Sequence, residues 1–314
     1  MHDRSHISRL DLRPNANTRL ADAEPRIDPA ALDEAYARAL ALEEPRAPDA
    51  VRLVWMRAGA RAGELGFRDL PARSDAFIVV GRHTRCDVVL PADPALALRH
   101  LLVRAVRLDD GSIATRVLDL KTGLGFHLDD DAQRRALVAS GPVALRVGRY
   151  ALVALPPGTL PGERPEPDVI DAPKMPAASA PRLTTSVTTL PPAPMLEDIA
   201  RDVAAAGLAR ITLRRDDAWA SVDVSEAALD AGVLVGRADR CEERLKKVLT
   251  EAVSRTHLLL LREHGVVHAF DVASTQGTFA DDARVRRVRM PDRGGTLRLG
   301  QTSPVVLEWH PRAS

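Results

Sequence analysis

Three short stretches in the second half of the sequence hold side chains suited to binding an anion. Arg237 ends a Val-Gly-Arg run, Ser254 opens a Ser-Arg-Thr-His run, and Thr275-Gln276 lies in a later polar run. A guanidinium presents a planar fork of N–H donors that fits two phosphate oxygens, and nearby hydroxyl and amide groups can hold the rest. Strand-like apolar runs separate the three stretches, so they are expected on separate loops. The chemistry indicated is recognition of a phosphate group by hydrogen bonds.

The same arrangement of residues occurs earlier in the chain. Four motifs recur in order: Gly81-Arg82 with Gly236-Arg237, Ala97 to His100 with Ser254 to His257, Asp119-Leu120 with Asp271-Val272, and Leu145 to Gly148 with Leu297 to Gly300. Ordered recurrence of this kind predicts a tandem duplication. The only two cysteines, Cys86 and Cys241, fall at matching places in the repeats. They are therefore expected to be two separate core thiols rather than one disulfide, as in a reducing cytosol.

Apolar residues alternate with a period of two in both repeats, which predicts short strands. Val51, Leu53 and Trp55 are expected on one half-buried strand. The other strand-like runs are 77–80, 101–103, 113–117, 143–147 and 150–155 in the first repeat, and 211–213, 219–224, 233–235, 258–261, 266–272, 297–299 and 305–309 in the second. Short strands joined by turn residues predict an all-β fold with two antiparallel β-sandwiches.

The segment before the first repeat is expected to be a polar arm followed by a helix. Residues 1–28 show no period and are predicted to be disordered. Leu32, Tyr36 and Leu40 then recur at helical spacing after Asp28-Pro29, so 29–44 is predicted to be an amphipathic helix. The helix either packs on the next domain or frays, or it docks a partner.

A proline-rich linker is expected between the repeats. Eleven of the 23 prolines fall between Pro156 and Pro194, and proline lacks the amide donor that a sheet needs, so this span is predicted to be extended and solvated. A short helix over 195–206, stopped by Gly207, is predicted at its end. The expected domains are 1–48 (arm and helix), 49–156 (first sandwich), 157–207 (linker with the inter-domain helix) and 208–312 (second sandwich).

The motifs of the second repeat resemble the forkhead-associated (FHA) family. They read Gly236-Arg237, then Ser254-x-x-His257, then a Ser-Thr-Gln-Gly-Thr loop in which Gln276 replaces the usual Asn. The resemblance covers about 50–156 and 208–311. It implies a β-sandwich with a loop-built site at one end that binds phosphothreonine in a partner protein.

The resemblance also implies roles for individual residues. The implied phosphopeptide-binding set is Arg237, Ser254, Arg255, Thr275 and Gln276. In that set the arginine and serine hold the phosphate, the threonine adds a hydroxyl bond, and the glutamine meets the peptide backbone. The implied structural set is Gly236, His257 and Gly277, in which the histidine braces the loops and Gly236 permits the turn before the arginine.

The first repeat departs from the family pattern where the chemistry lies. It keeps Arg82 and His100, but Ala97 replaces the serine, and Gly123 and Leu124 replace the Thr-Gln pair. This copy is therefore expected to have lost phosphate binding and to serve as a scaffold, a dimer surface or a phospho-independent binder. The neighbouring Thr122 could still supply a hydroxyl.

The second repeat departs from the pattern less. The side chain of Gln276 is one methylene longer than that of Asn. The interval from Arg237 to Ser254 is also two residues longer than the interval from Arg82 to Ala97. The charged run 242–247 within it is expected to be a solvated loop. In the alternative, Lys246 and Lys247 assist anion binding.

The linker contains a candidate modification site. Thr184-Thr185-Ser186-Val187 resembles the kinase-target segment that precedes the FHA domain in some small bacterial regulators, although Arg182-Leu183 stands where those proteins have an acidic residue. If Thr184 or Thr185 is phosphorylated, the second sandwich could bind its own linker. The alternative is an ordinary Thr/Pro-rich spacer.

Bulk properties argue against several function classes. The formal charge is +1, from 44 basic and 43 acidic residues, without the basic excess of a nucleic-acid binder. No apolar run suits a signal peptide or a membrane span, and a cytoplasmic protein is expected. His264 and His268 lack the helix and the glutamate of a zinc pair, and no P-loop is present, so no catalytic residue, metal or cofactor is expected.

The sequence thus predicts a non-enzymatic, phosphothreonine-dependent adaptor in bacterial Ser/Thr kinase signalling. Its expected partners are phosphothreonine-containing proteins, namely Ser/Thr kinases or their substrates. The alternative is a phospho-independent scaffold or oligomerisation protein in which both copies are silent.

Overall fold

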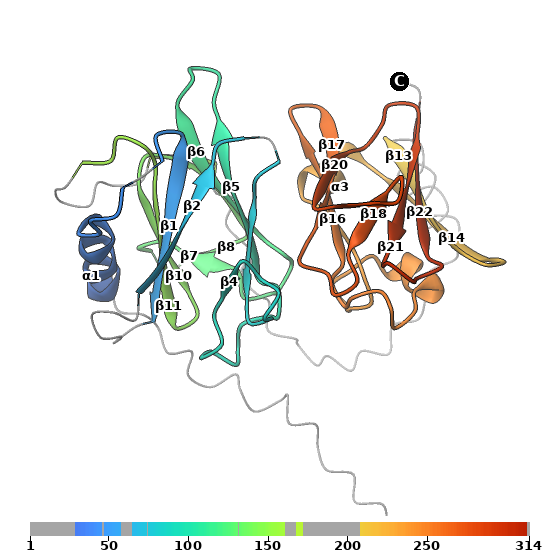
Figure 1. Ribbon diagram of the computed structural model, residues 1–314, viewed down its shortest axis with the longest axis horizontal. Coiled ribbons are helices and arrows are strands. Elements are labelled where there is room, and N and C mark those ends of the chain that lie inside the picture. Colours follow the sequence, from blue (N-terminus) through green and yellow to red (C-terminus); the bar gives the residue numbers. More distant parts are fainter. Residues whose placement is uncertain are drawn as a thin grey trace, which may run out of the picture.

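A computed structural model describes residues 29–45, 47–57, 65–73, 75–130, 132–160, 168–171 and 208–312. Within these residues the chain forms two β-sandwiches that lie side by side, with one helix on the far flank of the first (Figure 1). The predicted polar arm, the predicted helix at 195–206 and the candidate sites Thr184 and Thr185 lie outside the described residues. The all-β prediction is confirmed.

The helix α1 (Pro29–Leu40) ends earlier than the predicted 29–44, and it packs on the first sandwich, which is one of the alternatives that the sequence left open. Leu32, Tyr36 and the two alanines Ala35 and Ala39 are buried against the sheet that follows. Their spacing of three and four residues places them on one face of the helix. The helix therefore completes the first domain.

Two sheets form the first sandwich, in the orders β2-β1-β11-β10-β7-β8 and β12-β9-β6-β5-β3-β4. Their strands are β1 (Ala50–Arg57), β2 (Leu65–Pro71), β3 (Ile78–Gly81), β4 (Val88–Val89), β5 (Leu101–Arg107), β6 (Ile113–Asp119), β7 (Phe126–His127), β8 (Gln133–Arg134), β9 (Ala136–Ser140), β10 (Val143–Val147), β11 (Tyr150–Leu155) and β12 (Asp168–Asp171).

Two predictions for this half need correction. Strand β1 is buried on both faces rather than half-buried, because α1 covers the outer face that the period-two pattern left to solvent. The linker predicted over 157–207 also supplies a strand, since β12 pairs with β9 at the edge of the second sheet. The residues of β12 include no proline, so each can join the hydrogen-bond ladder.

The second sandwich repeats this plan, with the sheet orders β14-β13-β22-β21-β18-β19 and β15-β16-β17-β20. Its strands are β13 (Ala209–Arg215), β14 (Ala218–Val224), β15 (Val233–Val235), β16 (Leu258–Glu263), β17 (Val266–Asp271), β18 (Thr278–Ala280), β19 (Ala283–Val285), β20 (Arg287–Arg289), β21 (Gly295–Leu299) and β22 (Val306–Pro311). A short helix, α3 (Glu226–Asp230), precedes β15, and the side chain of Ser225 caps its first turn.

The charged run expected as a solvated loop is instead a 3₁₀ helix, η2 (Glu243–Val248). Leu245 and Val248, three residues apart, are buried in the core of the second sandwich and anchor this turn. Lys246 forms ion pairs with Glu243 and Asp239, so its charge is already balanced.

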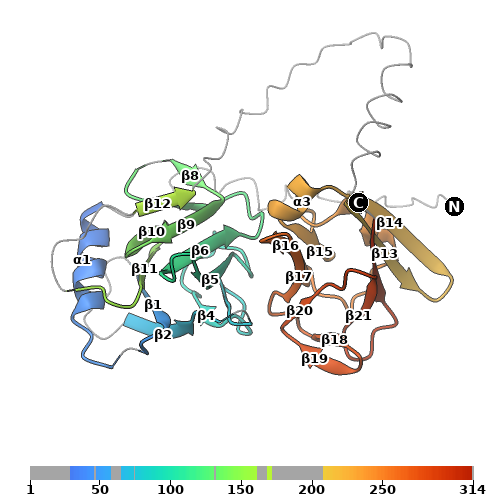
Figure 2. The same ribbon diagram turned by 90° about the horizontal axis from the view of Figure 1, so that it is seen from above.

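The two sandwiches pack against each other through the outer faces of β5 and β6 and of β16 and β17 (Figures 1 and 2). This interface is a third apolar cluster, composed of Phe77, Val79, Cys86, Leu102, Leu118 and Leu120 from the first copy and Leu234, Cys241, Leu259, Leu261, Phe270 and Val272 from the second. Both cysteines are free thiols, as predicted, but they lie between the sandwiches rather than inside either core.

Charged groups flank the apolar contact. The carboxylate of Glu263 on β16 forms ion pairs with Arg104 and Arg116 across the interface and with Arg287 of its own sandwich. Burial alone would raise the pKa of the Glu263 carboxyl, but the surrounding guanidinium groups hold that pKa below its ordinary value. The charge cluster therefore links the copies and depends on an ionised carboxylate.

Among the described residues, no helix has the length and apolar character needed to cross a lipid bilayer.

Candidate functional site

The site is built on the loops at one end of the second sandwich. Strand β15 leads into Gly236, where a Cβ atom would lie 2.5 Å from the carbonyl oxygen of Arg255. Only glycine therefore allows the loop after β15 to approach the loop before β16 this closely. The backbone amide of Arg237 then lies 3.4 Å from the carbonyl oxygen of Ser254.

Arg237 is an anchored side chain with an open end. Its Nε donates a hydrogen bond of 2.7 Å to the carbonyl oxygen of Val253, while the side chain is exposed. Neither terminal nitrogen of the guanidinium has a partner among the described residues. The anchor limits the rotamers of the side chain, and the terminal N–H groups remain available to an anion.

Ser254 connects the second loop to the third. Its side chain is nearly buried, with 7% exposure, and its Oγ accepts a hydrogen bond of 2.8 Å from the amide of Thr275. Because the hydroxyl is used as an acceptor here, its own hydrogen remains available as a donor. No acceptor for that hydrogen occurs in the described part of the chain.

His257 braces the same two loops from beneath. Its Nδ1 accepts a hydrogen bond from the amide of Ser254 (3.2 Å), and its Nε2 lies 3.1 Å from the carbonyl oxygen of Gly277. An acceptor at Nδ1 requires the proton on Nε2, which then donates to Gly277. Burial lowers the pKa of His257, so the ring is neutral at pH 7.

The third loop is shaped by Asp271. This residue belongs to the repeated motifs, but the sequence alone indicated no role for it. Its carboxylate accepts hydrogen bonds from the amide and the hydroxyl of Ser274 and from the hydroxyl of Thr278. The amide of Gly277 in turn donates to the hydroxyl of Ser274. This network leaves Thr275 and Gln276 exposed at the tip. The sequence signal for this hydrogen-bond network was the spacing of Asp271 and Ser274, which the first copy matches with Asp119 and Thr122.

The structure therefore brings Arg237, Ser254 and Thr275 together on three adjoining loops. Arg255 is exposed beside Ser254, and its side chain has no partner among the described residues. Arg284 on β19 is a further cation near the third loop, and the sequence motifs did not indicate it. A methyl group on Gly277 would lie 2.7 Å from Arg284 Nε, so this side chain packs over the tip of the third loop.

The corresponding loops of the first copy have the same framework. Arg82 Nε donates to the carbonyl oxygen of Leu96, and His100 bridges the amide of Ala97 and the carbonyl oxygen of Gly125. The Thr122 hydroxyl, left open as a phosphate donor by the sequence, donates instead to Asp119. It thus takes the place of Ser274, not of Thr275.

The first copy has different side chains at the positions that match Ser254 and Gln276. Ala97 offers no hydroxyl to the third loop, and Leu124 stands where the second copy has Gln276. The side-chain amide of Gln133 donates to the carbonyl oxygens of Gly123 and Leu124, which covers the loop from above.

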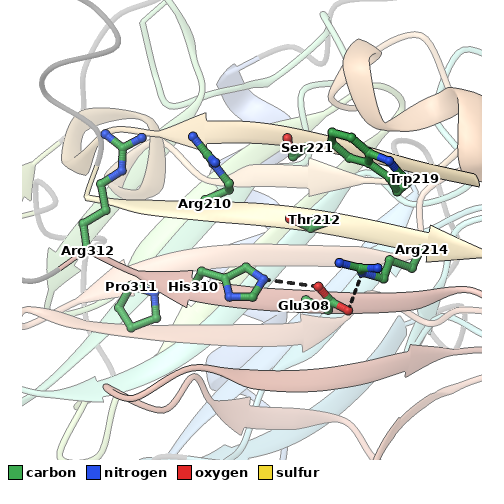
Figure 3. A pocket seen from close by; sticks show the side chains of 9 residues that line it. All are labelled: Arg210, Thr212, Arg214, Trp219, Ser221, Glu308, His310, Pro311 and Arg312. Carbon is green, nitrogen blue, oxygen red and sulfur yellow. Dashed lines mark hydrogen bonds and ion pairs between the residues drawn. The ribbon is translucent and has the colours of Figure 1, made fainter.

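A separate open hollow of about 490 Å³ lies on the outer face of β13, β14 and β22 (Figure 3). Its arginines are paired: Arg214 with Glu308, and both Arg210 and Arg312 with Asp223. Trp219 projects beside them with 66% exposure. The hollow shares no residue with the loop site, and its charges are largely balanced.

Residues 233–300 match the family model described as the FHA domain. No curated protein matches the chain. Similar solved structures include FHA-1 of Mycobacterium tuberculosis Rv1747, at 25% identity over 33% of this chain and 98% of that one, with a TM-score of 0.26.

Two further similar structures carry the same family name. One, from an analysis of phosphothreonine-dependent FHA domain interactions, is 24% identical over 33% of this chain and 99% of that chain, with a TM-score of 0.26. The other, the FHA domain of CT664 from Chlamydia trachomatis, is 17% identical over 34% and 96%, with a TM-score of 0.28. The family match spans Arg237, Ser254, Thr275 and their braces, so the FHA match lies within the second sandwich, and the first sandwich resembles a second, FHA-like copy.

Proposed function

We propose that this protein is a phosphothreonine-dependent adaptor whose second sandwich binds the phosphorylated partner. The observation that carries the proposal is the anchored guanidinium of Arg237, whose free N–H groups lie on the loop beside the available hydroxyl of Ser254. FHA domains are phosphopeptide-binding modules, which supports the same conclusion.

The chemistry of the ligand fits these groups. A phosphothreonine carries about −1.5 to −2 charges at neutral pH and three strong acceptor oxygens. The terminal N–H groups of Arg237 supply two parallel donors, and the Ser254 hydroxyl supplies a third. Arg255 and Arg284 add positive charge around the same loops. Thr275 and Gln276 are exposed at the loop tip. In the proposed complex, Thr275 adds a hydroxyl bond and Gln276 meets the peptide backbone.

The test is a titration of the full chain with a pool of phosphothreonine peptides and their unphosphorylated counterparts. Arg237→Ala is expected to lower affinity by tenfold or more, because a hydrogen bond to a charged group contributes roughly 1.5–3 kcal/mol. Arg82→Ala is the matched control, since Arg82 has the same anchor in the copy that lacks the hydroxyl partners. Equal binding of both peptide sets, or equal losses for both variants, would refute the proposal.

A phospho-independent scaffold is the second candidate. The observation that favours it is the extensive apolar interface between the copies, which gives the first sandwich a structural role without any ligand. Under this reading, removal of the phosphate leaves partner binding unchanged. The peptide titration therefore separates the two functions.

The proposal extends to the biological setting. The proposed partners of the protein are Ser/Thr kinases or their phosphorylated substrates in a bacterial cytoplasm. Phosphorylation of Thr184 or Thr185 would place a competing ligand on the same chain at roughly millimolar effective concentration. Kinase treatment of the full chain is then expected to weaken binding of an external phosphopeptide, and Thr184→Ala with Thr185→Ala is expected to abolish that weakening. Unchanged affinity after stoichiometric phosphorylation would eliminate this switch.

A further inference from the structure

The loop that carries Thr275 and Gln276 begins at a residue in an uncommon backbone conformation. Ala273 has φ +59°, a left-handed conformation that residues with a Cβ atom adopt at an energetic cost. Hydrogen bonds from outside the loop can compensate for that cost. The direction of the chain at Ala273 decides where the amide of Thr275 meets the hydroxyl of Ser254 two residues later.

The carbonyl oxygen of Ala273 is held by a side chain of the other sandwich. Arg99 Nε and Nη2 both donate to it, at 3.0 and 2.6 Å. The Arg99 side chain reaches across the interface between the copies, and the residue is only 3% exposed. Water cannot readily replace this contact, because the guanidinium is buried beside the apolar cluster that joins the sandwiches.

The main-chain carbonyl of Arg99 also contacts the second sandwich, through Arg240. Arg240 Nη2 donates to the carbonyl oxygen of Arg99 at 2.9 Å and to the hydroxyl of Thr256 at 3.0 Å. Thr256 lies between Arg255 and His257, in the loop that contains Ser254. Arg99 of the first copy is therefore linked directly to the third loop of the site and, through Arg240, to the loop that contains Ser254.

The two copies use this sequence position differently. Arg99 precedes His100 in the first copy, and Thr256 precedes His257 at the matching place in the second. The threonine is short and accepts a hydrogen bond within its own sandwich, whereas the arginine crosses to the other sandwich. The copy without the phosphate-binding hydroxyl thus supplies a support for the copy that has one.

We propose that Arg99 is a positioning residue for the phosphopeptide site, and that the first sandwich presets the Ala273–Gly277 loop of the second through its contact with the Ala273 carbonyl. The proposal rests on the proposed function for its effect on binding. Its effect on the loop does not depend on any ligand.

The test uses the full chain with Arg99→Met, which removes the donors and the buried charge but keeps a long apolar side chain in the interface. Phosphopeptide affinity is expected to fall roughly tenfold, since the loop must be ordered upon binding. Without peptide, hydrogen exchange at the Thr275 amide is expected to accelerate, because this amide is protected by Ser254 Oγ. Arg85→Ala, on the same face of the first copy but exposed, is the control and is expected to change neither readout.

A second substitution distinguishes positioning from general damage. Glycine adopts the left-handed conformation without strain, so Ala273→Gly in the Arg99→Met background is expected to restore part of the affinity and of the Thr275 protection. Unchanged Thr275 exchange in folded Arg99→Met would overturn the proposal, as would an exchange rate that Ala273→Gly fails to slow. A wild-type chain that binds no phosphopeptide refutes the proposed function, while the exchange measurement still decides the role of Arg99.

Discussion

The two sandwiches differ in their ligand-facing positions and agree in the residues that shape the loops. His100 and His257 make the same pair of loop contacts, and Asp119 and Asp271 accept hydrogen bonds from the hydroxyl three residues later. The loss of a hydroxyl at Ala97 left this framework intact. The loop framework therefore does not depend on the side chains to which phosphate binding is proposed.

The outer sheet faces of the two copies show a second contrast. On the first, Val54 and its cross-strand partner Val153 are buried beneath α1. At the matching register of the second copy, Thr212 lies opposite Glu308, and the face is open and polar. The apolar face binds a helix because leaving it in water would cost free energy in proportion to its area. The polar face needs no cover.

The largest expected effect concerns the contact that joins the copies. Glu263→Ala leaves Arg104, Arg116 and Arg287 without their shared carboxylate, and breaking a buried ion pair in this way costs about 3–5 kcal/mol. Chemical denaturation of the full chain measures the change. Glu308→Ala removes a partner of the exposed Arg214 and is the control, with an expected loss of about 1 kcal/mol or less. Equal losses would show that the interface contact contributes no more than a surface pair.

The next effect tests the contrast between the sheet faces. Leu32→Ala removes a fully buried side chain from the contact of α1 with the first sandwich, and a loss of about 2–5 kcal/mol in unfolding free energy is expected. Trp219→Ala, on the open face of the second sandwich, is expected to change stability by about 0.5 kcal/mol or less. Thermal unfolding of the two variants side by side gives the comparison.

Ser254→Ala makes the second site resemble the first. The variant loses the acceptor of the Thr275 amide and one donor to the phosphate, and an affinity loss of about 1–3 kcal/mol is expected from an unmade polar contact. Calorimetric titration with a phosphothreonine peptide measures it. Ala97→Ser in the first copy is the reciprocal change and is expected to create no phosphopeptide binding. Leu124 still occupies the position of Gln276, and the side chain of Gln133 still bonds to the same loop. Phosphate binding by Ala97→Ser would show that a single hydroxyl separates the copies.

The last effect is a dependence of stability on pH that both copies share. Burial lowers the pKa of His100 and of His257 in the folded state, and it lowers the pKa of His268 to about 4. The unfolded chain therefore binds protons first as pH falls below about 6.5, and each such histidine lowers the unfolding free energy by up to about 1.4 kcal/mol per pH unit. Denaturant midpoints at pH 7 and pH 5 test this. His257→Gln is expected to reduce the difference between the two midpoints.

The carboxylate between the copies responds at lower pH. The folded-state pKa of Glu263 lies below its unfolded value, so its contribution to stability is present above the unfolded pKa and is lost as pH falls through the folded one.

The sequence allowed prediction of the duplication, the all-β fold and the separate thiols, because each follows from the motifs and the apolar pattern. It predicted a helix before the first repeat but left open whether that helix packs. It did not allow prediction of the interface, since periodicity reports that a residue is apolar but not what covers it. The signal was present in the unbroken apolar run at 258–261, where Leu258 and Leu260 fill the core and Leu259 and Leu261 face the other sandwich. Continuous runs are typical of strands buried on both faces.

The differences at β12 and η2 have a similar cause. Composition averaged over the proline-rich linker concealed the proline-free run 168–171, three residues of which pair with β9. The charge of the 242–247 run concealed Leu245, which together with Val248 is buried in the second core. At the site, types and spacing identified which residues the loops bring together. The role of Asp271 and the support from Arg99 emerged only from three-dimensional contacts, since Arg99 and Ala273 are far apart in the chain.

The two buried thiols report whether the two sandwiches are in contact. Cys86 and Cys241 both lie in the interface, and their thiol groups point to the carbonyl oxygens of Leu98 and Arg255. Burial raises the pKa of Cys86 to about 11 and raises that of Cys241 as well, so neither forms a reactive thiolate while the halves are joined. Alkylation of these cysteines can proceed only when the sandwiches separate. The rate of alkylation therefore measures how often the sandwiches separate. A bound partner that holds the two sandwiches together would lower this rate.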